Sequence, residues 1–200
     1  MKSFTEYWSA TLVRGLLAIL TATAILFIPA MASTLLLLPF AVIISILCLA
    51  AYATIDSAIV LVTSFMIPHS PLNKHLTARL ALRIQGIAGV LIGMLLFVIV
   101  YDRTDLHWFL YLAALQAAAT AITEFIVARR TTFPHTAGWS YASSAIAALS
   151  AIALLFGHDF DPRQLAWLLY GYLGIFGITL FALAARMLFA ERTAAHHTPA

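Results

Sequence analysis

Residues 42–66 read VIISILCLAAYATIDSAIVLVTSFM, an apolar run of 25 residues in which Asp56 is the one charged side chain. A helix needs about 20 apolar residues to cross a hydrocarbon core of roughly 30 Å. A helix that is apolar on every face is buried either in a large protein core or in lipid. Because the whole chain has 200 residues, this run predicts a transmembrane helix.

The composition extends this prediction to the whole chain. Hydrophobic residues make up 63% of it and charged residues 10%, with a mean hydropathy of +0.98. A soluble domain has about 45–50% apolar and about 25% charged residues. The basic residues are scattered along the chain, which argues against nucleic-acid binding, and the composition excludes disorder. The single cysteine, Cys48, excludes a disulfide framework. We therefore expect an all-α, polytopic membrane protein.

Five further runs are apolar enough to span a membrane, which gives one membrane domain over residues 1–200. A turn at the membrane interface is expected over residues 30–40, where Pro39 disfavours a helix. The first run is longer than the 7–15 residues of a signal-peptide core, so we expect it to remain as a helix. Residues 190–200 are expected to form a flexible tail. The predicted spans are 8–29, 42–66, 78–100, 106–128, 139–157 and 164–189.

The basic residues in the loops, at the termini and near the span ends predict the orientation. The chain termini and the second and fourth loops carry Lys2, Lys74, Arg79, Arg129, Arg130, Arg186 and Arg192. The third and fifth loops carry only Arg103 and Arg163. Lys and Arg accumulate on the cytoplasmic side, so both termini are expected in the cytoplasm. Four tryptophans begin spans, as expected at a membrane interface: Trp8, Trp108, Trp139 and Trp167.

The spans group into three pseudo-repeated hairpins, whose rising helices share a pattern over residues 14–27, 83–97 and 143–156. Each begins with a polar residue, continues with small residues and ends at a phenylalanine. Such a pattern is typical of internal repeats in membrane proteins.

These motifs resemble those of the HdeD-like acid-resistance membrane proteins, over about residues 8–189. The resemblance lies in Arg14-Gly15, Phe27-Ile28-Pro29, and residues 51–57 and 171–177. It implies six spans in three hairpins, residence in the bacterial inner membrane and a role in stress at low pH. Two features depart from the family pattern: Ser57 stands where glycine is usual, and the loop over residues 67–77 is long.

Apart from Arg79 and Arg186 close to span ends, four charged residues lie inside predicted spans: Arg14, Asp56, Arg83 and Glu124. A charge at the membrane centre costs ~2.5–3.5 kcal/mol on insertion scales, so each marks a candidate polar site. At 1.5 Å per residue, Asp56 lies about 15 Å from the end of its helix and Arg14 about 9 Å. An extended arginine closes the difference. We therefore predict that Arg14 meets Asp56 inside the bundle; Arg83 and Glu124 offer the second hairpin a corresponding pair at compatible depth. These groups either bind a substrate or relay protons, or they are ion pairs that lock the hairpins, or side chains that snorkel to the interface.

Small residues predict where the helices approach closely. Gly86, Gly89 and Gly93 form one such face, and Gly171, Gly174 and Gly177 form another.

Three functions remain open. The first is stress tolerance without catalysis, as the resemblance implies. The second is a small transporter or proton-conducting protein that uses Arg14 and Asp56. The third is a membrane enzyme acting on a lipid or isoprenoid, which we disfavour because no metal-binding acid pair lies within a span. The sequence contains no HExxH motif, P-loop or dinucleotide fingerprint, so we assign no catalytic residue, cofactor or metal. The expected partners are the lipid bilayer and, as open alternatives, a second copy or another membrane protein; the ligand is left open.

Overall fold

The computed structural model describes the backbone of most of the chain and the side chains of its central segments. The described backbone covers residues 8–31, 38–66, 74–102, 106–130, 134–157 and 162–196. The described side chains are those of residues 8–27, 43–66, 77–99, 108–129, 138–157 and 164–189.

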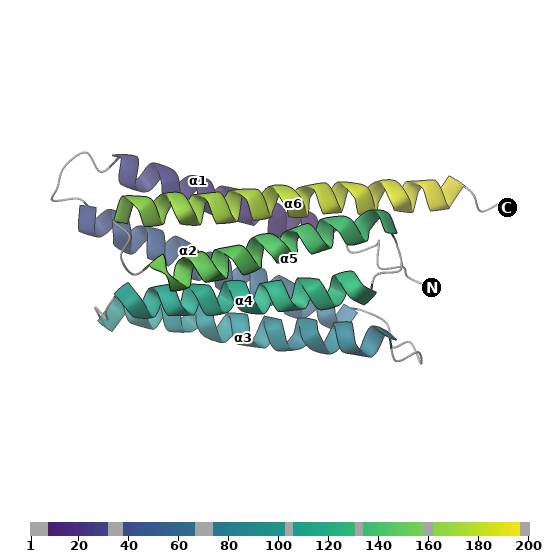
Figure 1. The fold of residues 1–200 in the computed structure, drawn as a ribbon, viewed down its shortest axis with the longest axis horizontal. Coiled ribbons are helices and arrows are strands. Elements are labelled where there is room, and N and C mark those ends of the chain that lie inside the picture. The colour runs from purple at the N-terminus through teal and green to yellow at the C-terminus, as the bar shows by residue number, and fades with distance from the viewer. Residues whose placement is uncertain are drawn as a thin grey trace.

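The described residues form an all-α structure with six helices, each of which is long and apolar enough to cross a membrane (Figure 1). This confirms the predicted architecture, which is that of an integral membrane protein. The helices are α1 (Trp8–Met31), α2 (Leu38–Met66), α3 (Lys74–Asp102), α4 (Leu106–Arg130), α5 (Pro134–Leu155) and α6 (Pro162–His196).

Prolines mark three helix starts. Pro39 is the second residue of α2, while Pro134 and Pro162 open α5 and α6. Proline is tolerated in the first helical turn because its missing N–H would have no intrahelical partner there. α2 therefore begins at Leu38, inside the segment predicted as an interfacial turn; residues 32–37 of that segment lie outside the described residues. α6 also continues to His196, into the segment expected to be a flexible tail.

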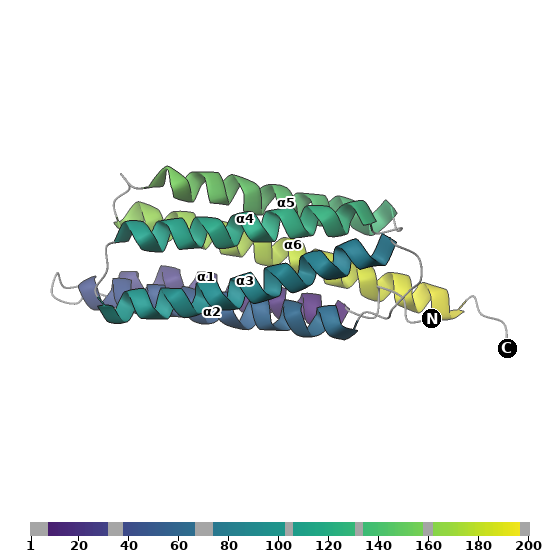
Figure 2. The ribbon, with the colours of Figure 1, turned by 90° about the horizontal axis from the view of Figure 1, so that it is seen from below.

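The helices pack in a closed ring that follows their chain order, with α6 returning to α1 (Figures 1 and 2). Extensive and limited interfaces alternate around this ring. The most extensive are α1/α6, α2/α3 and α4/α5, and the less extensive are α1/α2, α3/α4 and α5/α6. The helices that are consecutive in a predicted hairpin are thus the less closely packed ones. We call α1/α6, α2/α3 and α4/α5 the three tight pairs; the three-hairpin repeat remains a prediction.

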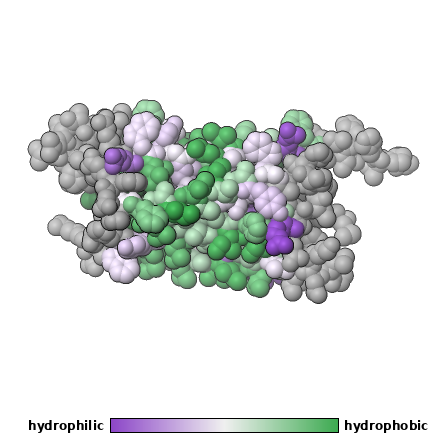
Figure 3. Space-filling model, viewed as in Figure 1, coloured by the Kyte–Doolittle hydropathy of each residue, from purple (hydrophilic) through white to green (hydrophobic). Residues whose placement is uncertain are grey.

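The outer surface of the bundle suits a lipid environment. Large apolar side chains are exposed along all of the helices, including Leu20 at 68% and Leu149 at 67%. Figure 3 shows hydrophobic residues in a central band and hydrophilic residues near the two ends of the described part. This distribution matches the hydrocarbon core of a bilayer and its two interfaces.

The interior differs between the two ends of the bundle. We call the end where α1 begins and α6 ends the proximal end, and the opposite end the distal end (Figure 1). Among the described side chains, fourteen polar or charged ones are buried, and of these only Gln116 and Ser150 lie distal to the midpoints of their spans. The twelve proximal ones are Arg14, Asp56, Ser57, Ser64, Gln85, Thr120, Thr123, Glu124, Ser140, Ser143, Ser144 and Thr179. Large apolar side chains fill the distal half, among them Ile25, Leu96, Phe109, Leu154, Leu173 and Phe176.

The α3 glycines lie at helix contacts, as predicted. A Cβ atom at Gly86 would stand 2.7 Å from Leu61 Cβ, and one at Gly93 would stand 2.9 Å from the backbone nitrogen of Thr54. These distances are shorter than van der Waals contact, so α3 needs glycine there to approach α2.

For α6 the glycine prediction is correct only at Gly177, where a Cβ would stand 2.8 Å from the Gly15 carbonyl oxygen. A Cβ at Gly171 or Gly174 would meet no atom within 4 Å, so the prediction is wrong at these two positions. The reason is helical geometry. A helix turns by roughly 100° per residue, so each step of three residues leaves a side chain about 60° away from the original face.

Candidate functional site

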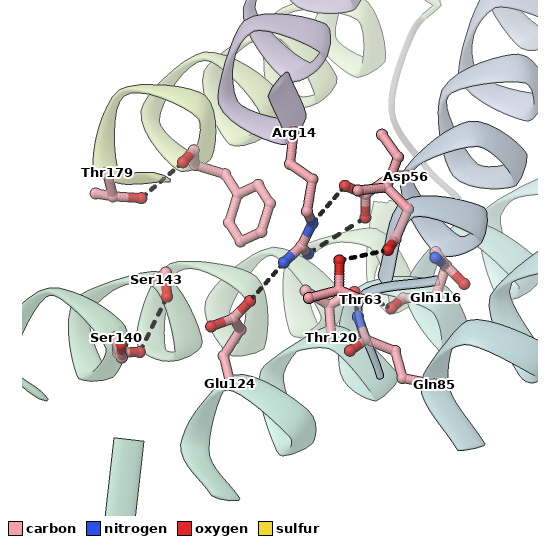
Figure 4. A network of polar contacts seen from close by, with 12 residues as sticks. Arg14, Asp56, Thr63, Gln85, Gln116, Thr120, Glu124, Ser140, Ser143 and Thr179 are labelled. Carbon is pink, nitrogen blue, oxygen red and sulfur yellow. Dashed lines mark hydrogen bonds and ion pairs between the residues drawn. The ribbon is translucent and has the colours of Figure 1, made fainter. Parts of the chain in front are cut away.

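Three charged side chains meet in the interior, with Arg14 between the other two (Figure 4). Arg14 Nε donates a hydrogen bond to Asp56 Oδ1 at 2.7 Å, and its Nη2 donates to Oδ2 at 3.3 Å. Its Nη1 donates to Glu124 Oε1 at 3.2 Å. The guanidinium group thus holds one carboxylate with two parallel bonds, the strongest geometry for such a pair, and a second carboxylate with one. We call Arg14, Asp56 and Glu124 the charged cluster.

The charged cluster is almost fully removed from the protein surface. Arg14 is 7% exposed, Asp56 2% and Glu124 6%. An unpaired charge at this depth would be costly, because it would lose its hydration with no compensating partner. The two carboxylates and the guanidinium therefore depend on one another to remain charged inside the membrane.

The fold brings these residues together from across the ring. Arg14 lies on α1, Asp56 on α2 and Glu124 on α4, so each belongs to a different tight pair. The long arginine side chain reaches from α1 across the interior to α4. Consequently the charged cluster is a junction that connects all three tight pairs.

The predicted contact between Arg14 and Asp56 is confirmed, and so is its position inside the bundle. The predicted pair of Arg83 and Glu124 is wrong. Glu124 instead faces Arg14, while the Arg83 guanidinium lies over the Phe65 ring of α2, 4.4 Å from its centroid. Arg83 Nε has no hydrogen-bond partner among the described residues.

A sequence pattern in α4 indicates the interior position of Glu124. Comparing depths within the second hairpin did not use this pattern. Gln116, Thr120, Thr123 and Glu124 recur at helical spacing along α4, and all four are buried. A polar stripe of this period on an apolar helix indicates a face that avoids lipid. It predicts an interior position for Glu124, although it does not identify the partner.

Two glutamines form hydrogen bonds between helices close to the charged cluster, Gln85 between the neighbours α3 and α4 and Gln116 between α4 and α2 across the interior. Gln116 Nε2 donates to Ser57 Oγ at 3.1 Å, and Gln85 Nε2 donates to Thr120 Oγ1 at 3.2 Å. The Thr120 hydroxyl in turn donates to the backbone carbonyl of Gln116 at 3.0 Å. The Oε1 atoms of both glutamines are buried and accept no hydrogen bond from any described residue.

Three buried hydroxyl groups of α5 and α6 donate hydrogen bonds to backbone carbonyls. Ser144 Oγ donates to the Ala121 carbonyl of α4 at 2.7 Å and so joins two helices. Ser143 and Thr179 donate to carbonyls three residues earlier in their own helices. These three hydroxyls therefore bind backbone acceptors and none of the three donates to the charged cluster.

Two cavities lie close to these residues. A small one of about 20 Å³ is lined by Leu49, Tyr52, Ala53, Leu96, Ala113, Gln116, Ala117, Leu154, Leu169 and Tyr172. A larger one of about 260 Å³ lies near the proximal end and is lined by Thr77, Phe125, Ile126 and Arg129. Neither is lined by Arg14, Asp56 or Glu124, so the charged cluster is enclosed by packed side chains.

The described side chains contain no group of three His, Cys, Asp or Glu residues that could hold a metal ion. The histidine side chains all lie outside the described set.

No protein-family model matches this chain, and no match is found among curated proteins or solved structures. The features of this chain that bear on function are therefore the geometry of the charged cluster and the distribution of polar residues around it.

Proposed function

We propose that this protein is a small membrane transport protein that binds and moves protons, with Arg14, Asp56 and Glu124 as its proton-binding site. The observation that carries the proposal is that two buried carboxylates share one guanidinium group. The proposal adds Glu124 to the pair that the sequence identified.

The charge balance of the cluster supports proton binding. One guanidinium and two carboxylates carry a net charge of −1, and a net charge is costly in an interior of low dielectric constant. One bound proton would bring the cluster to neutrality. The cluster therefore has a neutral form that holds one proton and an anionic form that has released it.

The packing around the cluster limits what can bind. The cavity lined by Tyr52 and Gln116 has a volume of about 20 Å³, which is the space of one water molecule. A lipid or isoprenoid substrate would need a pocket of several hundred Å³ next to the acids. Among the candidate species, a proton is the one that the enclosed site accommodates without rearrangement, and this favours transport over an enzyme that acts on lipids.

The polar residues of the proximal half support proton entry from the proximal end. Serines, threonines and glutamines accompany the cluster there, whereas large apolar side chains fill the distal half. We place the proximal end in the cytoplasm of a bacterial cell, because Lys and Arg predominate in the termini and loops at that end of the bundle. Proton movement through such a site would also fit the role at low pH that the sequence resemblance implies.

The same geometry supports a mechanism for coupling. A proton on the Glu124 carboxyl group would weaken its charge-assisted hydrogen bond to Arg14, since that bond depends on the opposite charges. The bond connects the tight pair α4/α5 to the tight pair α1/α6. Proton binding would then loosen one junction of the ring while Arg14 remains bound to Asp56.

Proton flux into liposomes containing the purified protein tests the proposal. A potassium gradient with valinomycin supplies the voltage, and an enclosed pH-sensitive dye reports the flux. We expect Glu124→Gln and Asp56→Asn to lower the flux at least tenfold. Gln85→Leu, which removes a different buried hydrogen bond, is the control and should leave the flux within twofold of the wild type.

Two outcomes would contradict the proposal. If wild-type and Glu124→Gln liposomes conduct equally, the cluster is not a proton-binding site. If the wild type conducts no protons while Glu124→Gln lowers the melting temperature, the cluster is a structural lock. The orientation is tested separately by labelling Thr104→Cys from outside the cell in a Cys48→Ser background; protection of that cysteine would contradict cytoplasmic termini.

A further inference from the structure

The larger of the two cavities lies between α3 and α4 near the proximal end. Its volume is about 260 Å³, and the described residues that line it are Thr77 of α3 and Phe125, Ile126 and Arg129 of α4. The proximal ends of these two helices lie side by side, and their interface is one of the less extensive ones of the ring (Figures 1 and 2). Since a water molecule needs roughly 10–15 Å³ of comparable space, this cavity has room for a group of several atoms.

The cavity lies at the level of a membrane interface. Thr77 is the first residue of the apolar span of α3, and Arg129 is the last residue of the apolar span of α4. Both side chains are exposed, and exposed apolar side chains continue from them toward the distal end. Ile84 on α3 and Ile122 on α4 each lie two helical turns, about 10 Å, from the cavity residue of the same face. The cavity is therefore placed where lipid head groups lie, next to a surface that contacts acyl chains.

Arg129 gives the cavity a positive charge that no described carboxylate neutralises. The described side chains include two carboxylates, those of Asp56 and Glu124, and both are bound by Arg14. The N-terminus of α3 and the C-terminus of α4 meet here, and their partial charges of about +0.5 and −0.5 oppose each other. The charge of the described groups at the cavity is therefore that of the Arg129 guanidinium, and the ligand that complements it is an anion.

Aromatic side chains hold the Arg129 guanidinium in place. Its Cζ atom lies 5.9 Å from the centroid of the Phe125 ring, one helical turn earlier. Phe125 in turn packs edge-to-face against Tyr141 of α5, with ring centroids 5.8 Å apart. A guanidinium group that rests on an aromatic ring keeps N–H donors at its edge, and these donors match two oxygens of a phosphate group. The hydroxyl of Thr77 adds a donor from the opposite helix.

We propose that this cavity binds the phosphate group of an anionic phospholipid in the proximal leaflet, with Arg129 as its charged partner and Thr77 as a hydrogen-bond donor. Basic pockets between transmembrane helices bind such head groups in other membrane proteins. The acyl chains of the lipid would lie along the exposed apolar side chains of α3 and α4, which is why a phospholipid fits this place better than a free phosphate ion. The inference does not depend on proton transport by the charged cluster.

Arg129→Gln and Arg186→Gln form a matched pair of variants for the test. Both arginines are exposed and lie close to the proximal ends of their spans, but Arg186 of α6 lines neither cavity. The purified full chain is titrated in dodecyl maltoside with dioleoyl phosphatidylglycerol, which is anionic, or with dioleoyl phosphatidylcholine, which is zwitterionic. Native mass spectrometry counts the bound lipids and gives the dissociation constant of the first one.

We expect the wild type to bind the first phosphatidylglycerol about fivefold more tightly than phosphatidylcholine, the factor that one basic side chain contributes at an anionic surface. Arg186→Gln should keep this preference, whereas Arg129→Gln should bind the two lipids equally within about twofold. Thr77→Val replaces the hydroxyl with a methyl group of similar size. It should weaken the binding of both lipids about threefold and leave their ratio unchanged, and it provides the test if Arg129→Gln fails to fold.

Several results would overturn the inference. Equal binding of the two lipids by the wild type, or a preference that persists in Arg129→Gln, would exclude an anionic-lipid site at this cavity. The same loss of preference in Arg186→Gln would assign it to the basic charge of the whole proximal end. Displacement of phosphatidylglycerol by glycerol phosphate at the same concentration would show that the site takes a free phosphate. Proton flux in Glu124→Gln tests only the proposed function, so its failure would leave the lipid site standing.

Discussion

The proximal and distal halves of this bundle have similar lipid-facing surfaces but different interiors. In the proximal half, side chains from α1, α2 and α4 are joined by ion pairs and hydrogen bonds around Arg14. In the distal half, the interior consists mainly of apolar side chains such as Phe109, Leu154 and Phe176. Lipid tails are as apolar as these residues, so only close packing stabilises the distal contacts. The two halves therefore use different forces within one ring of helices.

The two halves therefore contribute differently to the fold: the ion pairs select one arrangement of the helices, and apolar packing stabilises it. Apolar packing tolerates many similar arrangements, whereas an ion pair with defined geometry does not, because a displaced partner leaves a buried charge alone. The proximal half should therefore be more sensitive to changes in charge, and the distal half to changes in volume.

The largest effect is expected from Arg14→Met, which leaves two buried carboxylates without a counter-charge. Breaking a buried ion pair in this way costs about 3–5 kcal/mol of unfolding free energy. Arg83→Met is the matched control, since Arg83 interacts with the Phe65 ring and with no described carboxylate; we expect a loss of about 1 kcal/mol. Unfolding in mixed micelles measures both values. Equal losses would show that the charged cluster does not stabilise the proximal half.

The next effect concerns the coupling between Arg14 and Asp56. We expect the double variant Arg14→Gln/Asp56→Asn to be more stable than the sum of the two single losses predicts, by about 1–3 kcal/mol. The reason is that each single variant leaves a buried partner unpaired, while the double variant leaves none. A double-mutant cycle of unfolding free energies gives the coupling, and an additive result would contradict the ion pair.

A volume change in the distal half should have a moderate effect. Leu154→Ala removes a side chain that is 1% exposed and should lower the unfolding free energy by about 2 kcal/mol, through lost packing contacts. Leu149→Ala, on the lipid-facing side of the same helix, should change it by less than about 0.5 kcal/mol. If the two variants lose the same stability, the distal interior is not held together by packing.

The smallest changes in unfolding free energy are expected for Gly174 and Gly177 of α6, and their signs should differ. Gly174→Ala should raise the unfolding free energy by ~0.5–1 kcal/mol, because it restricts the unfolded chain and meets no atom within 4 Å. Gly177→Ala should lower it by about 1 kcal/mol, since the new methyl group would press on the Gly15 carbonyl. Melting temperatures in detergent give the signs, and the same sign for both would contradict the contact between α1 and α6.

The sequence was sufficient for the features that depend on one helix, since apolar length alone defines the spans. For two consecutive helices it was sufficient only in part: comparing depths paired Arg14 with Asp56 correctly and Arg83 with Glu124 wrongly. The contact of Arg14 with Glu124 joins α1 to α4, and it depends on how the ring closes. No local pattern contains that information. Gly171 and Gly174 failed as predicted contacts for a related reason, because residue spacing identifies small faces but not which neighbour covers them.

The length of α6 has a practical consequence. At 1.5 Å per residue, its 35 residues extend about 52 Å, well beyond a hydrocarbon core of roughly 30 Å. Figure 1 shows that α6 extends beyond the ends of the other helices at the proximal end. A helical fusion partner attached in register near His196 would inherit its orientation from α6. Such a fiducial would make a protein of 21.8 kDa large and asymmetric enough for single-particle imaging in a lipid nanodisc.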